Sequence, residues 1–157
     1  MTDARFEDGD ERPLRLMAAE ADDLPVIAAL VQDAVFPITE MRFDPKARRF
    51  VLLLNRFRWE DRTAAEAAKR PYERVRSLLV VEDVLRLRSS GIDRTDRDTV
   101  LSILTLEFAS GSDGMGTLTL LLAGDGAIAI DVEAVNLRLE DVTRPYVAPS
   151  RKVPDHG

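Results

Sequence analysis

The chain of 157 residues has no cysteine and only one histidine, His156, close to its end. Without cysteine there can be no disulfide framework, thiol nucleophile, cysteine-ligated zinc ion or iron–sulfur cluster. A lone histidine in a tail supplies neither the base for a serine nucleophile nor a pair of imidazole metal ligands. The sequence therefore predicts a protein that is not an enzyme and that holds no metal and no cofactor.

The remaining polar patterns have structural explanations. Asp131 and Glu133 alternate with Ile130 and Val132, which is typical of a strand with one solvent-facing side rather than of a catalytic pair. The glycine-rich run 111–116 precedes an apolar alternating segment and lacks the lysine of a phosphate-binding loop. Neither pattern predicts catalysis.

Long hydrophobic runs are also missing. Apolar runs such as Phe50–Leu54, Leu78–Val81 and Leu120–Ala123 are far shorter than the roughly 18–20 residues of a membrane span. The first residues are acidic and polar, unlike a secretory signal. With 45% hydrophobic residues, the chain has enough apolar side chains for one folded domain. We expect a soluble, cytoplasmic protein that does not enter a membrane.

The two ends of the chain differ in composition from the middle. Residues 1–12 are acidic, with Phe6 as their only large apolar side chain, and predict a flexible tail. Residues 145–157 contain three prolines and no periodicity, and predict a C-terminal tail. A single domain is expected over residues 13–144.

One helix is clearly indicated at about 22–34. Asp22 and Asp23 can cap its start, and Pro25 fits the first turn. An apolar stripe follows at Leu24, Ile27, Val31 and Ala34. A second segment, Thr63–Glu66, resembles a capping box and predicts a short surface helical turn.

The rest of the chain has the alternation of strands. Segment 75–89 fits either one long bent strand or two strands that meet at Glu82 and Asp83, and the apolar parity flips after Ala134, which predicts a β-bulge there. Gly124-Asp125-Gly126 and the run 111–116 predict hairpin turns. The predicted fold is α+β, with a mainly antiparallel sheet of about seven to eight strands and one helix. The alternative is a strongly curved, barrel-like sheet of the pleckstrin-homology-like kind.

Four segments carry a resemblance to a known family, and they occur in the order VIAALVQDAV, RRFVLLLNRFRWE, ERVRSLLVVEDVLRLRSSGIDR and GTLTLLLAGDGAIAIDVEAVNLRLEDV. The motif LNRFRWE and the turn 90–94 are the most specific. Over about residues 14–150 the chain resembles domain-of-unknown-function family 2948, an uncharacterised bacterial family found mainly in alphaproteobacteria. The resemblance implies a cytoplasmic bacterial protein and carries over no activity and no catalytic residue.

Arginine is the one residue type whose distribution stands out. Residues 42–97 carry a net charge of +6 between two acidic segments, 1–41 at −7 and 98–157 at −5, in a chain whose formal net charge is −6. Many arginines are spaced by two, as in neighbouring side chains on one face of a strand. The candidate binding residues are Arg56, Arg58, Trp59, Arg74, Arg76, Arg86 and Arg88. Alternatively, these arginines pair with the acids of 98–142 across the sheet.

The leading functional hypothesis is a non-enzymatic interaction or scaffold module, which binds a protein partner or a second copy of itself. It would use the arginine-bearing sheet face or an unpaired edge strand. One alternative is binding of an anion, a phosphate or single-stranded RNA through the arginines, although the acidic composition argues against nucleic acid. A second alternative is a small apolar ligand inside a curved sheet.

Overall fold

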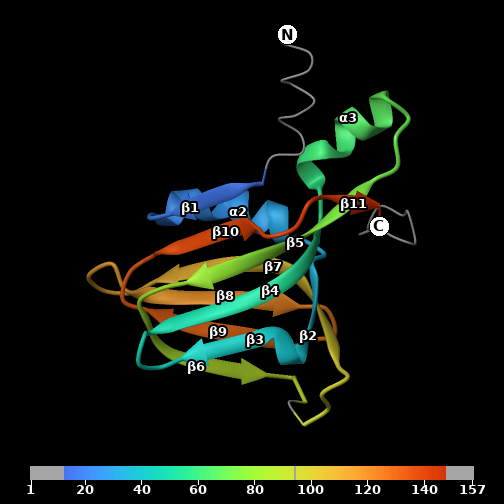
Figure 1. The fold of residues 1–157 in the computed structure, drawn as a ribbon. Coiled ribbons are helices and arrows are strands. Elements are labelled where there is room, and N and C mark those ends of the chain that lie inside the picture. The colour runs from blue at the N-terminus through green and yellow to red at the C-terminus, as the bar shows by residue number, and fades with distance from the viewer. Residues whose placement is uncertain (1–12, 94, 148–157) are drawn as a thin grey trace.

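The computed structural model describes residues 13–93 and 95–147, and Figure 1 shows its fold. One antiparallel sheet of eleven strands is accompanied by short helices. The strands are β1 (Arg15–Ala18), β2 (Val35–Pro37), β3 (Met41–Asp44), β4 (Arg49–Phe57), β5 (Glu73–Val81), β6 (Val84–Ser90), β7 (Val100–Ser110), β8 (Gly116–Leu122), β9 (Ala127–Val132), β10 (Leu137–Asp141) and β11 (Tyr146–Val147). The helical segments are η1 (Ala21–Asp23), α2 (Leu24–Val31), η2 (Ile38–Glu40), η3 (Trp59–Asp61) and α3 (Arg62–Ala67).

The α+β class and the mainly antiparallel sheet are confirmed, but the counts of elements were wrong. There are eleven strands rather than seven to eight, and the described residues hold two α-helices rather than one. The additional strands β1, β2, β3 and β11 have two to four residues each, too few for alternation to show in a sequence. The predicted tail 1–12 lies outside the described residues, as do residues 148–157 of the predicted C-terminal tail 145–157. Within the described part of that tail, Tyr146 and Val147 form β11, which pairs with β5.

The sheet is curved but does not close into a barrel (Figure 1). Its strand order is β1-β10-β5-β4-β2-β7-β8-β9-β6, with β3 added on β4 and β11 on β5. In the described part of the chain, β3 pairs only with β4 and β6 only with β9. The Val84 amide donates to the carbonyl oxygen of Arg48, in the turn between β3 and β4, at 2.9 Å. No ladder within residues 13–93 and 95–147 joins β3 to β6.

Segment 75–89 consists of two strands rather than one. Between β5 and β6 the chain turns at Asp83, whose φ of 57° is left-handed, and the side chain of Asp83 accepts a hydrogen bond from Asn136 at 3.2 Å. Before the turn, β5 pairs with β4 and β10, and after it β6 pairs with β9. The turn therefore passes the chain from an interior strand of the sheet to the strand at one end of the strand order.

The prediction of a β-bulge near Ala134 is wrong. The parity flip there marks a break between β9, which pairs with β8 and β6, and β10, which pairs with β5 and β1. A shift of one residue and a change of partner strand give the same sequence pattern. Bulges occur instead in β6 between Val84 and Arg86 and in β7 between Ile103 and Thr105.

The hairpin turns are where the sequence places them. Gly124 and Asp125 both have positive φ, 85° and 71°, a conformation that glycine and aspartate adopt more readily than most residues. The other turn joins β7 to β8, with Asp113 and Gly114 at positive φ. The strands on either side of each turn pair antiparallel, so both predicted hairpins are present.

The predicted helix is present but shorter than expected. It begins with η1 and continues as α2, which ends at Val31 because Gln32 has extended ψ and Asp33 a left-handed φ of 64°. Leu24, Ile27 and Val31 are buried in the main core, with side chains of β4, β7, β8, β9 and β10. No helix among residues 13–93 and 95–147 has the length and apolar character to cross a membrane.

Candidate functional site

The structure places the first predicted arginine pair in the interior. Arg56 is 0% exposed and Arg58 is 5% exposed. Arg56 lies on the same side of β4 as the buried residues Leu52 and Leu54, so it extends the core-facing row rather than the solvent-facing one. Of the two arrangements that the sequence leaves open, these two side chains adopt the one in which arginines pair with acids, as described below. The sequence does not decide between them, because a continuous apolar run gives no parity from which to assign the two faces of a strand.

Arg56 is the centre of a buried ionic cluster that joins four elements. Its guanidinium donates to both Glu60 oxygens at 2.8 and 2.7 Å, to Asp141 at 3.0 and 3.1 Å and to Ser77 Oγ at 3.1 Å. The Ser77 hydroxyl and the Leu14 amide also donate to Asp141, at 2.7 and 2.9 Å. The cluster ties β4 to β5, β10 and η3, and its donors are already used. It is suited to holding the fold rather than to binding a ligand.

A neighbouring group of charges extends this cluster along η3. The Arg58 guanidinium donates to Glu73 at 2.6 Å and lies 3.5 Å from Asp61. Arg70 donates to both oxygens of Asp61, at 3.0 and 3.1 Å. Asp61 is only 3% exposed, and these two arginines supply the charge that its burial requires.

Burial and pairing act in opposite directions on Glu60. Desolvation by burial favours its neutral form, but the hydrogen bonds and the charge of Arg56 outweigh that effect, and the pKa of Glu60 lies below its usual value. Glu60 is thus held as a carboxylate. A general acid would need the opposite shift, so the cluster does not have the character of an acid–base site.

The other predicted residues do not form one surface. Arg74 is half-buried, donates to Asn55 Oδ1 at 2.6 Å and has a pKa lowered by burial. Arg76, Arg86 and Arg88 are exposed, and Arg88 pairs with Asp131 at 2.7 Å. Because β5 and β6 occupy different places in the sheet order, the pair on β5 and the pair on β6 are not side by side.

Trp59 has a packing role in this structure. Its indole Nε1 donates to the Gln32 carbonyl oxygen at 2.9 Å, just after the end of α2. Its ring centroid lies 4.6 Å from that of Phe57. These contacts anchor η3 to α2, and an indole N–H that already has a partner is typical of a structural tryptophan.

Among the described residues, the pairing of the basic middle segment with later acids is observed at three places. Arg48 pairs with Glu133, Arg56 with Asp141 and Arg88 with Asp131. The hydrogen bond from Thr117 is the largest cause of the lowered pKa of Asp131, and Arg88 adds to it. Asp131 and Glu133, the carboxylates examined for catalysis, are therefore both engaged in ion pairs.

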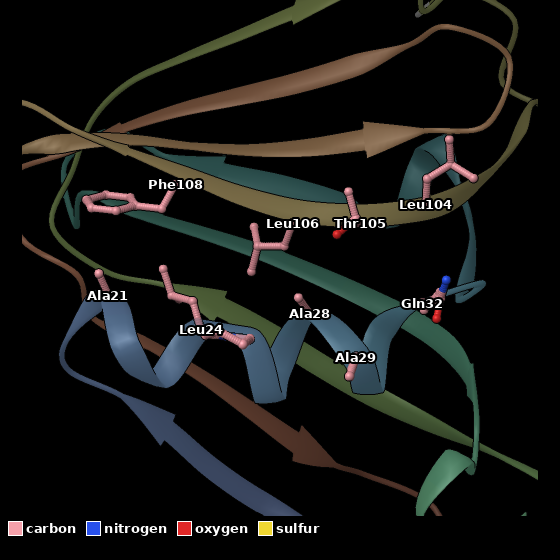
Figure 2. Close-up of a pocket in the computed structure, with 10 residues that line it drawn as sticks. Ala21, Leu24, Ala28, Ala29, Gln32, Leu104, Thr105, Leu106 and Phe108 are labelled. Atoms are coloured by element: carbon pink, nitrogen blue, oxygen red, sulfur yellow. The ribbon is translucent and has the colours of Figure 1, made fainter.

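A groove between α2 and β7 was not anticipated from the sequence. Its volume is about 530 Å³, and Figure 2 shows its two walls. One wall consists of Ala21, Leu24, Pro25, Ala28, Ala29 and Gln32, and the other of Leu104, Thr105, Leu106 and Phe108. Only Gln32 and Thr105 contribute polar side chains.

The helical wall gives α2 a second apolar face. Leu24, Ile27 and Val31 face the core, while the side chains that line the groove recur from Ala21 to Gln32 at spacings of three and four. The helix LPVIAALV has no polar side chain, yet Val26 is 56% exposed and Pro25 and Ala29 are exposed too. The signal that could have revealed the groove is this absence of polar residues, because a helix that is apolar all round is normally buried.

The strand wall contains a bulge residue. Ile103 pairs with Leu122 and Thr105 with Leu121, so Leu104 is the extra residue on β7, and it is 41% exposed. Bulges are common beside binding sites because they redirect a side chain. At the other end of the groove, Phe108 packs so closely over Gly116 that a Cβ there would overlap its ring.

A smaller hollow lies between the unpaired edges of β3 and β6. Its volume is about 50 Å³, and residues from both strands line it, including Arg42, Arg88 and Ser89. Arg42 pairs with Val51 in the ladder, and its exposed side chain forms no hydrogen bond or ion pair with the described residues. Arg42 was not among the sequence candidates because it stands alone, without a second arginine at strand spacing.

The side chains that the structure describes contain no group of three or more His, Cys, Asp or Glu arranged to hold a metal ion. His156 lies outside the described residues. No curated protein and no solved structure matches the chain. A family described as "Protein of unknown function (DUF2948)" matches residues 14–156, nearly the whole chain. The chain therefore belongs to the DUF2948 family, as its sequence resemblance implied.

Proposed function

We propose that this protein is a non-enzymatic interaction module that binds an apolar helical segment of a partner protein in the groove between α2 and β7. The observation that carries the proposal is α2 itself, a helix without a polar side chain whose residues Pro25 and Ala29 are exposed and line the groove. Exposed contiguous apolar surface is typical of protein contact sites.

The dimensions of the groove favour a helix as its occupant. It runs from Ala21 to Gln32, twelve positions that span about 18 Å at helical rise. This length matches about three turns of a partner helix, which can present apolar side chains at spacings of three and four to the groove. Alanine and proline on the α2 wall leave room for a second backbone to approach.

Matched substitutions test this proposal. Ala29→Glu and Leu104→Glu place a charge on each wall of the groove. Ala67→Glu on α3 and Leu85→Glu on β6 are the controls, because Ala67 is also an exposed helical alanine and Leu85 is also an exposed bulge leucine, 47% against 41%. Tagged proteins are compared in pull-downs from the source organism, followed by binding measurements with purified candidates.

We expect the wild type and both controls to retain the same partner protein. Both groove variants should bind that partner at least tenfold more weakly. A charge buried in an apolar contact costs more than the 1.4 kcal/mol that a tenfold loss requires. Equal retention by all five proteins contradicts the proposal. Circular dichroism confirms that the variants are folded.

Anion binding at the hollow between β3 and β6 is the second candidate. It is favoured by Arg42, an exposed arginine without a hydrogen-bond or ion-pair partner among the described residues, which lines the hollow together with Arg88. Titration with inorganic phosphate and with a short single-stranded RNA tests this function at low salt. Binding should weaken in Arg42→Ala and with rising salt, and no binding at low salt contradicts it.

A further inference from the structure

The acids beside the groove point to the charge of its occupant. We infer that the partner helix is cationic, with lysine or arginine gathered at the end that lies beside the start of α2. This inference rests on the proposed function, since it specifies the partner of the same groove.

The two segments that form the walls of the groove contain no basic residue. Every charged side chain from Leu16 to Met41 is acidic, and so is every charged side chain from Asp98 to Asn136. Such a long one-sided distribution is notable in a chain with 22 basic residues. A helix that enters the groove meets negative charge and no positive charge from either wall.

The negative charge is concentrated at one end. Glu20, Asp22 and Asp23 are exposed and lie beside the lining residues Ala21 and Leu24. None of the three carboxylates forms an ion pair with the described residues. Asp23 accepts hydrogen bonds from the backbone amides of Ala19 and Glu20, which orient it without neutralising it.

The dipole of α2 does not cancel this charge. A helix start carries about half a positive charge, whereas three carboxylates carry three negative ones. At the other end of the groove the situation differs, because the positive charge of Arg74 acts on Asp33, and Arg74 donates to the Asp33 carbonyl oxygen at 3.3 Å. The potential along the groove is therefore most negative at the start of α2, and this asymmetry predicts the orientation of the partner helix.

A second copy of this chain is a poorer occupant. Two copies that meet through their grooves would bring four acidic wall segments together, and like charges at an interface reduce affinity. A separate cationic helix meets the same walls with complementary charge. The apolar side chains of the groove then provide the contact area. The lysines of the partner helix determine its orientation and raise its rate of association.

The experiment uses three fluorescent peptides of about twelve residues with one apolar leucine–alanine face. They differ only at one end, where they carry three lysines, three glutamines or three glutamates. Anisotropy titrations with the full chain are carried out at about 50 and 300 mM salt. The lysine peptide should bind at least fivefold more tightly than the glutamine peptide at low salt, and this preference should shrink at high salt.

Asp22→Asn tests the location of the charge, because the Asp22 side chain has no hydrogen bond or ion pair in the described structure. The substitution should weaken binding of the lysine peptide about two- to fivefold, as expected for one exposed charge pair. It should leave the affinity for the glutamine peptide unchanged. Asp125→Asn, an exposed acid in the β8–β9 turn, is the matched control and should change neither.

The outcomes separate the two proposals. Equal binding of all three peptides, each lost in Ala29→Glu, overturns the cationic partner and leaves groove docking intact. If no peptide distinguishes the wild type from Ala29→Glu, groove docking fails as well. Dimerisation of the wild type that Ala29→Glu abolishes would identify a second copy as the occupant and overturn this inference.

Discussion

The importance of single residues is clearest at Arg56, a guanidinium that is 0% exposed. It is stable in the interior because Glu60 and Asp141 provide opposite charge and Ser77 and the Phe57 carbonyl oxygen accept further hydrogen bonds. The cluster explains why arginines at strand spacing can be structural. The sequence shows a charged side chain, whereas its burial depends on acids that are 4 and 85 positions away.

Arg56→Met should lower the free energy of unfolding by about 3–5 kcal/mol, because it leaves buried Asp141 without its cation. Urea denaturation followed by circular dichroism measures the loss. The exposed Arg86→Met should change stability by less than about 0.5 kcal/mol. The double variant Arg56→Met/Asp141→Leu should lose less than the sum of the single variants. Additive losses would contradict the coupling described for this cluster.

Glu60 gives the cluster a predictable pH dependence. Its pKa in the folded protein lies below the ordinary value of 4.5, so the folded state binds its proton less readily than the unfolded state. The stability contributed by Glu60 is therefore complete above its ordinary pKa and is lost as the pH falls through the lower folded pKa.

Glu60→Gln should be less stable than the wild type at pH 7 and should lose less stability between about pH 5 and pH 3. Unfolding free energies measured across this range check both statements. Ser110→Ala, which changes an exposed side chain on β7 without removing a titratable group, is the control and should keep the slope of the wild type. A wild-type slope in Glu60→Gln would show that Glu60 does not carry this dependence.

At the scale of elements, most of the fold could be predicted from the sequence, while the pairing of strands could not. The helix around Leu24–Val31, the long strands β4, β5, β7, β8 and β9 and the two glycine turns have strong local signals. The break after Val132 has no such signal, because a bulge and a new strand both change the parity of apolar residues. Partner strands are chosen by contacts between distant residues, which one sequence does not show.

The groove was missed for a related reason. In the sequence, Pro25, Ala28 and Ala29 lie between the core residues of one helix and show no role of their own. Their meaning comes from β7, which is more than 70 residues further along the chain and supplies Leu104 and Phe108 on the opposite wall. Sequence analysis can flag a helix without polar side chains, but it cannot show that the outer face of that helix is exposed.

Gly116 sets the end of the groove through its contact with Phe108. In Gly116→Ala the new Cβ would overlap the Phe108 ring and lie 2.6 Å from the Ala109 carbonyl oxygen. We expect a loss of about 1–3 kcal/mol in unfolding free energy and weaker binding of groove peptides. Gly111→Ala, whose Cβ would lie 3.5 Å from its nearest neighbour, is the matched control. Equal stability of the two variants would contradict the packing described at Phe108.

For the whole molecule, the net charge of −6 hides an uneven distribution. Much of the positive charge of the middle segment is used internally, in ion pairs with acids of the same chain such as Arg56–Asp141 and Arg58–Glu73. In the two chain segments that form the walls of the groove, residues 16–41 and 98–136, every charged residue is acidic. The described part of the molecule thus combines buried, charge-paired arginines with a groove whose lining side chains are mostly apolar and whose wall segments carry acidic charges, and this groove is the basis of the proposed function.

The most direct measurement is site-specific photo-crosslinking in the source organism. A benzophenone amino acid is placed at Ala29, in the groove, or at Ala67, an exposed helical alanine outside it. We predict a defined protein adduct from position 29 that is absent from position 67 and that disappears when Leu104→Glu is added. The same adducts from both positions, or none from position 29, would contradict a docking groove between α2 and β7.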